Sequence, residues 1–311
     1  MADALTVIGE ALVAYWTSPW PLTVLLVCGA SMGTLLYVFV TNARNAKLRV
    51  SLLTGLYGLS IFFWLFIALS LGLCIWQSGM VAYRRNGVQV AASGAVLAAL
   101  AASLLISLVV WKTAPGRVLR RFAPRAPRPG ETWLQEYADL LAEFEAAPRA
   151  DVGIVESTDG IALAVSGRPP RILISEGLLV TLDPDEVRSA LAHEVMHLKH
   201  HDAEFKVFST VLSRVFFFDP FSKFFDPAVH REREYLADEM SGRATGKPSA
   251  LASALLKIAS RSAPQRAAWG LSLVGPGSGI FSRYPPLGER VHRLLLLSEI
   301  LAASRASVEK S

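Results

Sequence analysis

Three long stretches in the N-terminal third of the chain contain no charged residue, and this limits the possible folds more than any other feature. The stretches near residues 20–40, 51–76 and 88–111 contain no Asp, Glu, Lys or Arg. Crossing the hydrocarbon core of a bilayer takes about 20 apolar helical residues, so we predict three transmembrane helices there. Buried helices of a soluble core are the alternative, but three uncharged runs of this length are rare in one. Asp3 and Glu10 precede the first stretch, which is therefore not expected to be a cleaved signal peptide.

The basic residues between and after these stretches orient the helices. Segment 42–49 has three of them, segment 77–87 has two, and segment 112–128 has six and no acidic residue. Lys and Arg favour the cytoplasmic side of a membrane. With the N-terminus outside, nine basic residues lie inside and two outside. We therefore predict a multi-pass protein of the cell membrane in which everything after residue 111 is cytoplasmic.

A basic, proline-rich linker at 112–130 follows the membrane region, 1–111. It either touches anionic lipid headgroups or is a solvated connector that only sets the topology. The basic linker beside the membrane accounts for a net charge of +5 without a nucleic-acid partner. The lipid bilayer is therefore an expected partner, and nucleic acid is not. Cys28 and Cys74 lie within predicted spans and lack the spacing of a metal site or a disulfide framework.

Residues 131–311 have the pattern of a mixed α+β domain. Apolar residues recur at helical spacing, then short β-like runs alternate with turn residues, and later helices begin with Asp-Pro, where Asp caps and Pro fits the first turn. The expected elements are a helix at 131–147, strands at 152–157, 161–167 and 171–175, helices starting near Asp183 and Asp226, and helices at 248–260 and 286–303. The predicted fold is a helical membrane region followed by this domain.

The sequence LAHEVMHLKHHD, residues 191–202, holds four of the six histidines. His193 and His197 are four residues apart and so share one face of a helix, where both imidazoles can bind one ion. Glu194 can accept a proton from a water on that ion. The pattern is H-E-x-x-H, the helix of zinc hydrolases. We predict one zinc ion per chain, with His193 and His197 as ligands and Glu194 as general base.

A catalytic zinc ion takes three protein ligands and an open position. His201 lies about 12 Å along the helix axis from His193, too far to share the ion. Lys199, His200 and His201 are therefore expected to form a polar face. Asp202 is either a solvated residue of that face or a group that supports a ligand.

The sequence HREREYLADEM, from residue 230, offers the third ligand. Glu234 is our choice, because Asp238 one turn later could accept the spare N–H of a ligand histidine. His230, one turn earlier, is the second candidate, with a histidine at a helix start as its plain structural reading. Glu232 points about 160° away from Glu234 and is the poorer carboxylate.

The segments LAHEVMH, REREYLADEMS and TGKPSALASALLKI resemble, in this order, the HtpX-type membrane-bound zinc endopeptidases. The resemblance covers about residues 130–300 and implies a zincin-like domain with two His and one Glu on the metal. The residues that match the family are the ligands His193, His197 and Glu234, the base Glu194, and Asp238 of E-x-x-x-D.

Two features depart from that family. Its late His-Pro-x-x-x-x-Arg motif is YPPLGER here, so Arg290 matches but Tyr284 replaces the histidine. Tyr284 could donate a hydrogen bond toward a substrate oxyanion. The family has a hydrophobic hairpin before the catalytic part and further spans after it, whereas this chain has three predicted spans before it and none clearly predicted after it. Segment 206–225 is apolar but interrupted by charges, and it is expected to be interfacial or core-packing.

The chain also partly resembles the β-lactam-sensor antirepressor metallopeptidases. The shared pattern is H-E-x-x-H-x-x-x-x-D, which ends here at Asp202. Those sensors carry a large extracytoplasmic domain after the protease, and we expect none here.

The expected reaction is hydrolysis of peptide bonds, with Glu194 moving the proton from water to the leaving amine. Substrate is expected to lie extended beside an edge strand, 171–175, and to pair through its backbone. This favours unfolded or damaged membrane proteins as substrates. A sensor protease that cuts one regulator is the alternative, and an inactive scaffold is a third. The glycine-rich stretch 270–283 is either a flap or a loop, and the oligomeric state is left open.

Overall fold

The computed structural model describes most of the chain and divides it into two compact units. The described residues are 4–41, 46–83, 105, 109, 112–113, 116–202, 205–206, 209, 220–261 and 282–308. The first unit combines Met1–Val110 with Thr210–Asp226, and the second combines Trp111–Ser209 with Pro227–Ser311. Each unit is described by itself.

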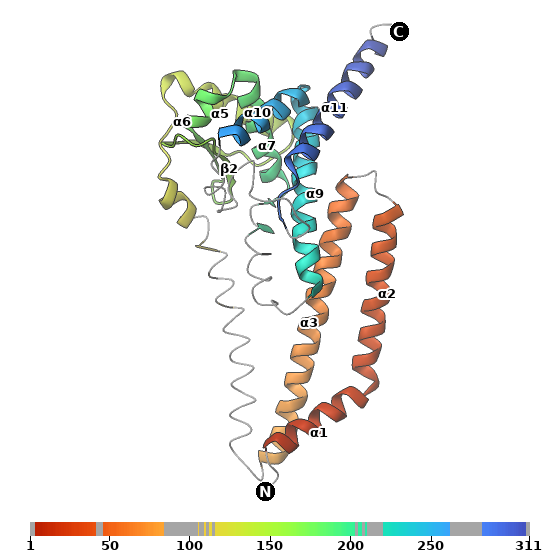
Figure 1. The fold of residues 1–311 in the computed structure, drawn as a ribbon. Coiled ribbons are helices and arrows are strands. Elements are labelled where there is room, and N and C mark those ends of the chain that lie inside the picture. Colours follow the sequence, from red (N-terminus) through yellow and green to blue (C-terminus); the bar gives the residue numbers. More distant parts are fainter. Residues whose placement is uncertain are drawn as a thin grey trace. The chain divides into compact units, whose positions relative to one another are not determined.

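The first unit contains three described helices, α1 (Ala4–Thr17), α2 (Pro19–Thr41) and α3 (Ala46–Tyr83) (Figure 1). Within them, Pro21–Phe39 and Lys47–Ser78 are long and apolar enough to cross a membrane, with mean hydropathies of 2.0 and 2.3. Only 6% and 17% of these segments are buried inside the protein. Core helices of a soluble protein would be mostly buried, so the soluble alternative for these two helices is not supported.

Helix α1 was not expected from the sequence, and it packs against α3. The Tyr15 hydroxyl lies 2.5 Å from Ser70 Oγ, and Cys74 Sγ lies 3.7 Å from the carbonyl oxygen of Ala11. Burying polar groups among apolar helices costs free energy unless they find such partners. Helix α3 also extends beyond the predicted span at both ends.

Three expectations fall mainly outside the described residues. They are the third span at 88–111, the segment 206–225 and the glycine-rich stretch 270–283. They stay predictions, as do the domain limits drawn from the sequence.

The second unit combines a small sheet with helices, as the sequence predicts. Its named elements are η1 (Pro129–Glu131), α5 (Trp133–Phe144), β1 (Asp151–Val155), β2 (Ala162–Val165), β3 (Arg171–Ser175), α6 (Glu176–Thr181), α7 (Pro184–Lys199), most of α9 (Pro220–Thr245), α10 (Pro248–Arg261) and α11 (Leu287–Val308). One apolar core joins α5, the sheet, α7 and α10, and within it Leu134, Ile154, Ile172, Leu191 and Leu255 are fully buried.

The strand order corrects one expectation. The order is β1-β3-β2, with β3 parallel to β1 and antiparallel to β2. The strand 171–175, expected at an edge, is therefore the central one, and β2 is an edge strand. Arg125 pairs with Ile154 on the other side of β1 through two backbone hydrogen bonds of 2.8 and 2.9 Å. Sequence pattern predicts strands but not their neighbours, because pairing depends on residues far apart in the chain.

Helix α7 begins where the sequence predicts, at a capping box. The Asp183 side chain accepts a hydrogen bond from the backbone N–H of Glu186 at 2.9 Å, and the Glu186 carboxylate accepts one from the N–H of Asp183 at 2.9 Å. Glu186 is buried and is also bound by Ser253 at 2.6 Å and Lys257 at 2.7 Å from α10. The start of α7 is thus fixed both locally and by a neighbouring helix.

Helix α9 begins earlier than predicted. The sequence suggested a start at Asp226–Pro227, but the helix runs from Pro220 and includes Pro227 in its interior. Asp219 and Pro220 form the same Asp-Pro start signature seven residues upstream. A proline inside a helix removes one backbone hydrogen bond but is tolerated when packing holds the helix on both sides.

Arg125 in the basic linker pairs with two carboxylates of the second unit, and loss of its pair with Glu131 should lower stability in a pH-dependent way. Arg125 donates two hydrogen bonds to Glu131, at 2.7 and 2.9 Å, and one to Glu176 at 2.7 Å. The hydrogen bonds from Arg125, together with the Arg128 N–H, lower the pKa of Glu131 from 4.5 to about 2 although burial opposes this. The stabilisation is therefore complete above pH 4.5 and is lost as the pH falls toward 2.

Replacing Glu131 by Gln should cost about 1 kcal/mol at pH 7, allowing for partial exposure of the pair, which is about 2–4 °C in Tm for a unit of this size. Thermal unfolding of the detergent-purified protein at pH 7 and below pH 4 measures this, and the difference should shrink at the lower pH. Glu143→Gln is the matched control, because Glu143 pairs with Arg149 at 3.7 Å on an exposed surface. A constant difference at both pH values would contradict the assignment.

Candidate metal centre

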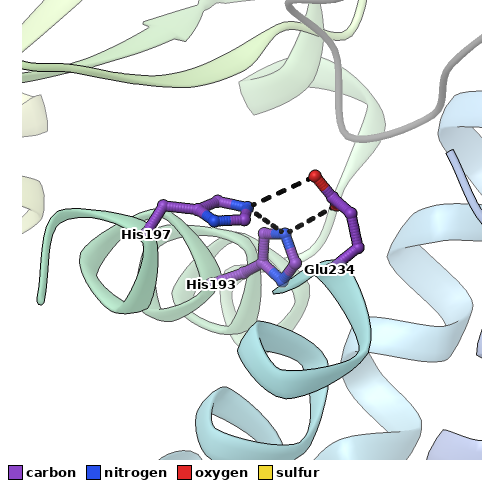
Figure 2. A group of neighbouring side chains, drawn as sticks. All are labelled: His193, His197 and Glu234. Carbon is purple, nitrogen blue, oxygen red and sulfur yellow. Dashed lines mark hydrogen bonds and ion pairs between the residues drawn. The ribbon is translucent and has the colours of Figure 1, made fainter. Parts of the chain in front are cut away.

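Two histidines of α7 face one another across a single helical turn. His193 and His197 are four residues apart, and their Nε2 atoms lie 3.0 Å from each other (Figure 2). His193 is fully buried, and His197 is half-buried. The helical repeat of 3.6 residues alone places both rings on one face.

Helix α9 brings a carboxylate to the same point. Glu234 Oε2 lies 3.6 Å from His193 Nε2, and Glu234 Oε1 lies 3.7 Å from His197 Nε2. Figure 2 shows the glutamate reaching from α9 toward both rings of α7. One potential ligand atom from each residue lies within 4.8 Å of the others. Two imidazole nitrogens and one carboxylate oxygen are the ligand set of a catalytic zinc site.

An aspartate and an arginine support the first histidine. His193 Nδ1 lies 3.0 Å from Asp238 Oδ1, so the far side of the ring faces a carboxylate. Arg290 from α11 holds that carboxylate with two hydrogen bonds, from Nε at 2.7 Å and from Nη2 at 2.6 Å. Arg290 Nη1 also lies 3.5 Å from Glu234 Oε2. Asp238, predicted to accept from a ligand histidine, and Arg290, which matches the late motif, therefore both lie directly behind the ligand group.

The second histidine has a similar support, from a residue whose role the sequence left open between two alternatives. His197 Nδ1 lies 2.7 Å from Asp202 Oδ2, and Arg233 of α9 pairs with the same carboxylate. Arg233 also lies over the ring of Phe205, 4.0 Å from its centre. Asp202 therefore supports a ligand and is not a solvated residue. The role of Arg233 could not be inferred, because nothing in its sequence position points to Asp202.

The electrostatics of the group favour a bound cation. Burial on its own lowers the pKa of His193, but Asp238 and Glu234 outweigh it and raise that pKa to about 9. Burial raises the pKa of Glu234, but His197, His193 and Arg290 hold it well below its usual range. The carboxylates thus stay ionised and favour a positive charge at His193. A metal ion supplies that charge when the imidazoles are deprotonated for binding.

Glu194 is buried beside the first ligand and held by the edge strand. Its Oε2 accepts a hydrogen bond of 2.6 Å from the backbone N–H of Ala164 in β2, and its exposed fraction is 4%. This contact points the N–H of Ala164 away from β3 and places the outer side of β2 next to the carboxylate. A carboxylate fixed in this way is suited to accept and release a proton repeatedly at one place.

Two further residues predicted near the site, His230 and Tyr284, make contacts outside the ligand group. His230 lies outside the ligand group among the described residues: its Nε2 is 2.8 Å from Ser209 Oγ, and its ring contacts Phe205. Tyr284 is buried, and its hydroxyl accepts a hydrogen bond from Lys206 at 3.1 Å. The alternative of His230 as third ligand is therefore not supported.

Of the polar residues that follow the ligand histidines, Lys199 and His200 contact other parts of the second unit and His201 is exposed. Lys199 donates to Glu145 at 2.8 Å, and His200 Nε2 lies 3.0 Å from Met240 Sδ. His201 is exposed and has a φ of +54°, in the left-handed region that ends a helix. None of the three belongs to the ligand group found among the described residues.

Comparisons with known proteins show which proteins this chain is similar to. The family model BlaR1 peptidase M56 matches residues 163–279. A "Protease HtpX homolog" of Pyrococcus abyssi is 29% identical over 67% of this chain and 88% of its own length. One from Pyrococcus furiosus is 31% identical over 52% of this chain and 72% of its own. The crystal structure of S. mikatae Ste24p aligns with 89% of this chain and 99% of its own, with a TM-score of 0.39 and 14% identity.

Proposed function

The chain belongs to the HtpX family of proteases, and from this premise we propose that it is a membrane-bound zinc endopeptidase. His193, His197 and Glu234 hold a single zinc ion, and Glu194 is the general base. The convergence of three potential ligand atoms within 4.8 Å of one another, two of them from the buried residues His193 and Glu234, carries this proposal. The site lies on helices whose sequence motifs match the family, so its chemistry is hydrolysis of peptide bonds.

The metal and the protein divide the chemistry between them. When bound, zinc supplies a Lewis acid that lowers the pKa of water toward neutrality and polarises the scissile carbonyl. Glu194 takes the proton from the attacking water and passes it to the leaving amine. The backbone N–H of Ala164, 2.6 Å from Glu194 Oε2, holds the carboxylate in place for both transfers. Asp238 lies 3.0 Å from the far nitrogen of His193, and Asp202 lies 2.7 Å from the far nitrogen of His197. These carboxylates orient both rings.

The edge strand suggests how substrate binds. We place the substrate backbone, in extended form, along the outer side of β2, because that side lies next to Glu194. The strand Ala162–Val165 has only small and aliphatic side chains. Pairing through the backbone then selects for unfolded chains rather than for a sequence. This supports quality control of misfolded or damaged membrane proteins as the cellular role.

A regulatory protease is the second candidate, because the BlaR1 peptidase match covers the catalytic region. Comparing membrane proteomes of cells with the active protein and with its Glu194→Gln variant separates the two. Quality control predicts that many damaged membrane proteins accumulate with the variant. A single stabilised partner, with casein left uncut by the purified protein, would favour the regulatory role.

The orientation is also a proposal and rests on the basic residues of the loops. The second unit is cytoplasmic, since segment 112–128 has six Lys or Arg and no acid. A reporter protein fused after residue 311 that works only in the cytoplasm should be active. A reporter active only outside the membrane would contradict this orientation.

Metal removal is the direct test of the proposed function. Detergent-purified protein should lose casein cleavage when a chelator removes its metal and should regain it with one zinc per chain. The reason is that neither Glu194 nor the other side chains can activate water or polarise a carbonyl alone. Metal content by mass spectrometry and cleavage rate should fall and recover together. Undiminished cleavage by metal-free protein would overturn the proposal.

A further inference from the structure

A lysine and a tyrosine form a buried pair whose chemistry the proposed zinc site leaves unused. Lys206 Nζ donates a hydrogen bond of 3.1 Å to the Tyr284 hydroxyl and also lies 4.9 Å from the centre of its ring. Tyr284 is 7% exposed, and Lys206 is half-buried. The two residues are 78 positions apart, so only the fold brings them together.

The segment of Tyr284 is anchored to α9 on both sides of Glu234. Before the tyrosine, the carbonyl oxygen of Ser282 accepts a hydrogen bond of 2.7 Å from Arg231, one turn before Glu234. After it, Arg290 binds Asp238, one turn after Glu234. These two contacts hold the segment of Tyr284 against α9 on both sides of the glutamate ligand, whose charge acts on the tyrosine.

The charges around the pair keep the lysine in its protonated form. Burial alone would lower the pKa of Lys206, but Tyr284, Glu234 and Glu194 outweigh it and the pKa is raised. The lysine therefore stays protonated within the electrostatic field of both the ligand and the base. Arg290 is paired with Asp238 and Arg233 with Asp202, so each of these arginines already balances an aspartate.

The hydrogen-bond direction determines what the tyrosine can do. An ammonium group can only donate, so Lys206 uses a lone pair of the phenol and leaves the phenolic proton for another acceptor. Burial raises the pKa of Tyr284, which keeps that proton in place at neutral pH. A donor held by a cation is also a stronger donor, since hydrogen bonds involving charged groups are stronger and shorter.

We propose that Lys206 and Tyr284 stabilise the negative charge that develops on the substrate carbonyl oxygen during hydrolysis. Tyr284 is the catalytic residue that donates to the oxyanion, and Lys206 is the positioning residue that orients and polarises the phenol. This inference rests on the proposed function and adds to it a residue, Lys206, that no sequence motif marks. Preorganised donors of this kind act on the transition state more than on the bound substrate.

The test compares four variants with the wild type in zinc-loaded, detergent-purified full-length protein. They are Tyr284→Phe, Lys206→Met, Lys206→Arg and the double variant Tyr284→Phe/Lys206→Met. With labelled casein, Tyr284→Phe should lower kcat by about 10²-fold, the usual effect of losing one oxyanion donor, with little change in KM. Lys206→Met should lower kcat in the same way, and Lys206→Arg should retain most of it.

The double variant should be no slower than the worse single variant, because the lysine acts through the tyrosine. Matched controls are Lys247→Met, an exposed lysine paired with Asp185, and Tyr137→Phe on α5, and neither should change kcat. Full kcat in Tyr284→Phe or in Lys206→Met would overturn the inference. Losses that multiply in the double variant would overturn it as well.

A binding measurement separates failure of this inference from failure of the proposed function. A phosphonamidate peptide presents a tetrahedral anion that mimics the transition state. By calorimetry it should bind Tyr284→Phe and Lys206→Met at least about tenfold more weakly than the wild type, while all variants keep one zinc per chain. Equal affinity would overturn the inference even if casein is cleaved. Loss of zinc from these variants would also overturn it, by showing a structural role.

Discussion

Replacing Glu194 by Gln is expected to lower the rate of casein cleavage by about 10²–10⁴-fold, the range attributed to general acid–base catalysis. The amide keeps the size of the side chain but cannot accept the proton of the attacking water. Because Glu194 is not one of the three ligands, the variant should still bind one zinc per chain. Cleavage of labelled casein and metal content by mass spectrometry, measured on one preparation, check both statements.

The matched control is Glu239→Gln on α9. Glu239 is exposed and pairs with Arg243 at 3.0 Å in the next helical turn, so its loss should leave cleavage unchanged. A Glu194→Gln variant that cleaves at the wild-type rate would exclude Glu194 as the base. Loss of zinc with the loss of activity would instead assign Glu194 to holding the metal.

Replacing Arg290 by Met is expected to cost about 3–5 kcal/mol of folding free energy, the usual result of removing one partner of a buried ion pair. Arg290 is 2% exposed, and Asp238 is 3% exposed. Two hydrogen bonds of 2.6 and 2.7 Å join them. Without the guanidinium, Asp238 keeps a buried charge whose remaining close partner is His193. The variant should unfold at a lower temperature and bind zinc about 10–100-fold more weakly, because Asp238 orients a ligand.

The double variant Asp238→Asn/Arg290→Met tests whether the loss of stability comes from an unpaired buried charge. Removing both charges should restore part of the stability that Arg290→Met alone loses, because no unpaired charge is left in the interior. Arg243→Met, an exposed arginine of α9, is the control and should change Tm little. A single variant as stable as wild type would show that the pair is not a structural element of the site.

The site was largely predictable because its central part is local. The capping box at Asp183 and Glu186 fixes where α7 begins, and the helical repeat then puts His193 and His197 on one face. Glu234 could be chosen because Asp238 follows it by one turn. These are relations between residues a few positions apart, which sequence alone determines.

The two helices long and apolar enough to cross a membrane were predictable for a similar reason. Uncharged runs longer than a bilayer is thick have one stable solution, a helix that satisfies its own backbone. Two of the three predicted spans coincide with such helices, within α2 and α3. The start of α9 was misplaced because two Asp-Pro pairs lie seven residues apart, and only packing selects between them.

Tertiary structure alone decided which distant groups meet. The sequence gives no sign that β2 is the edge strand beside Glu194, that Arg233 holds Asp202, or that Lys206 reaches Tyr284. Each of these pairings joins residues separated by 30 or more positions. Local periodicity specifies the face on which a side chain lies, whereas its partner depends on how helices and strands pack into one core. The sequence by itself determined the two helices long and apolar enough to cross a membrane and the spacing that puts His193 and His197 on one helix face. The packing determined the carboxylates behind these histidines, the strand beside Glu194 and the lysine–tyrosine pair.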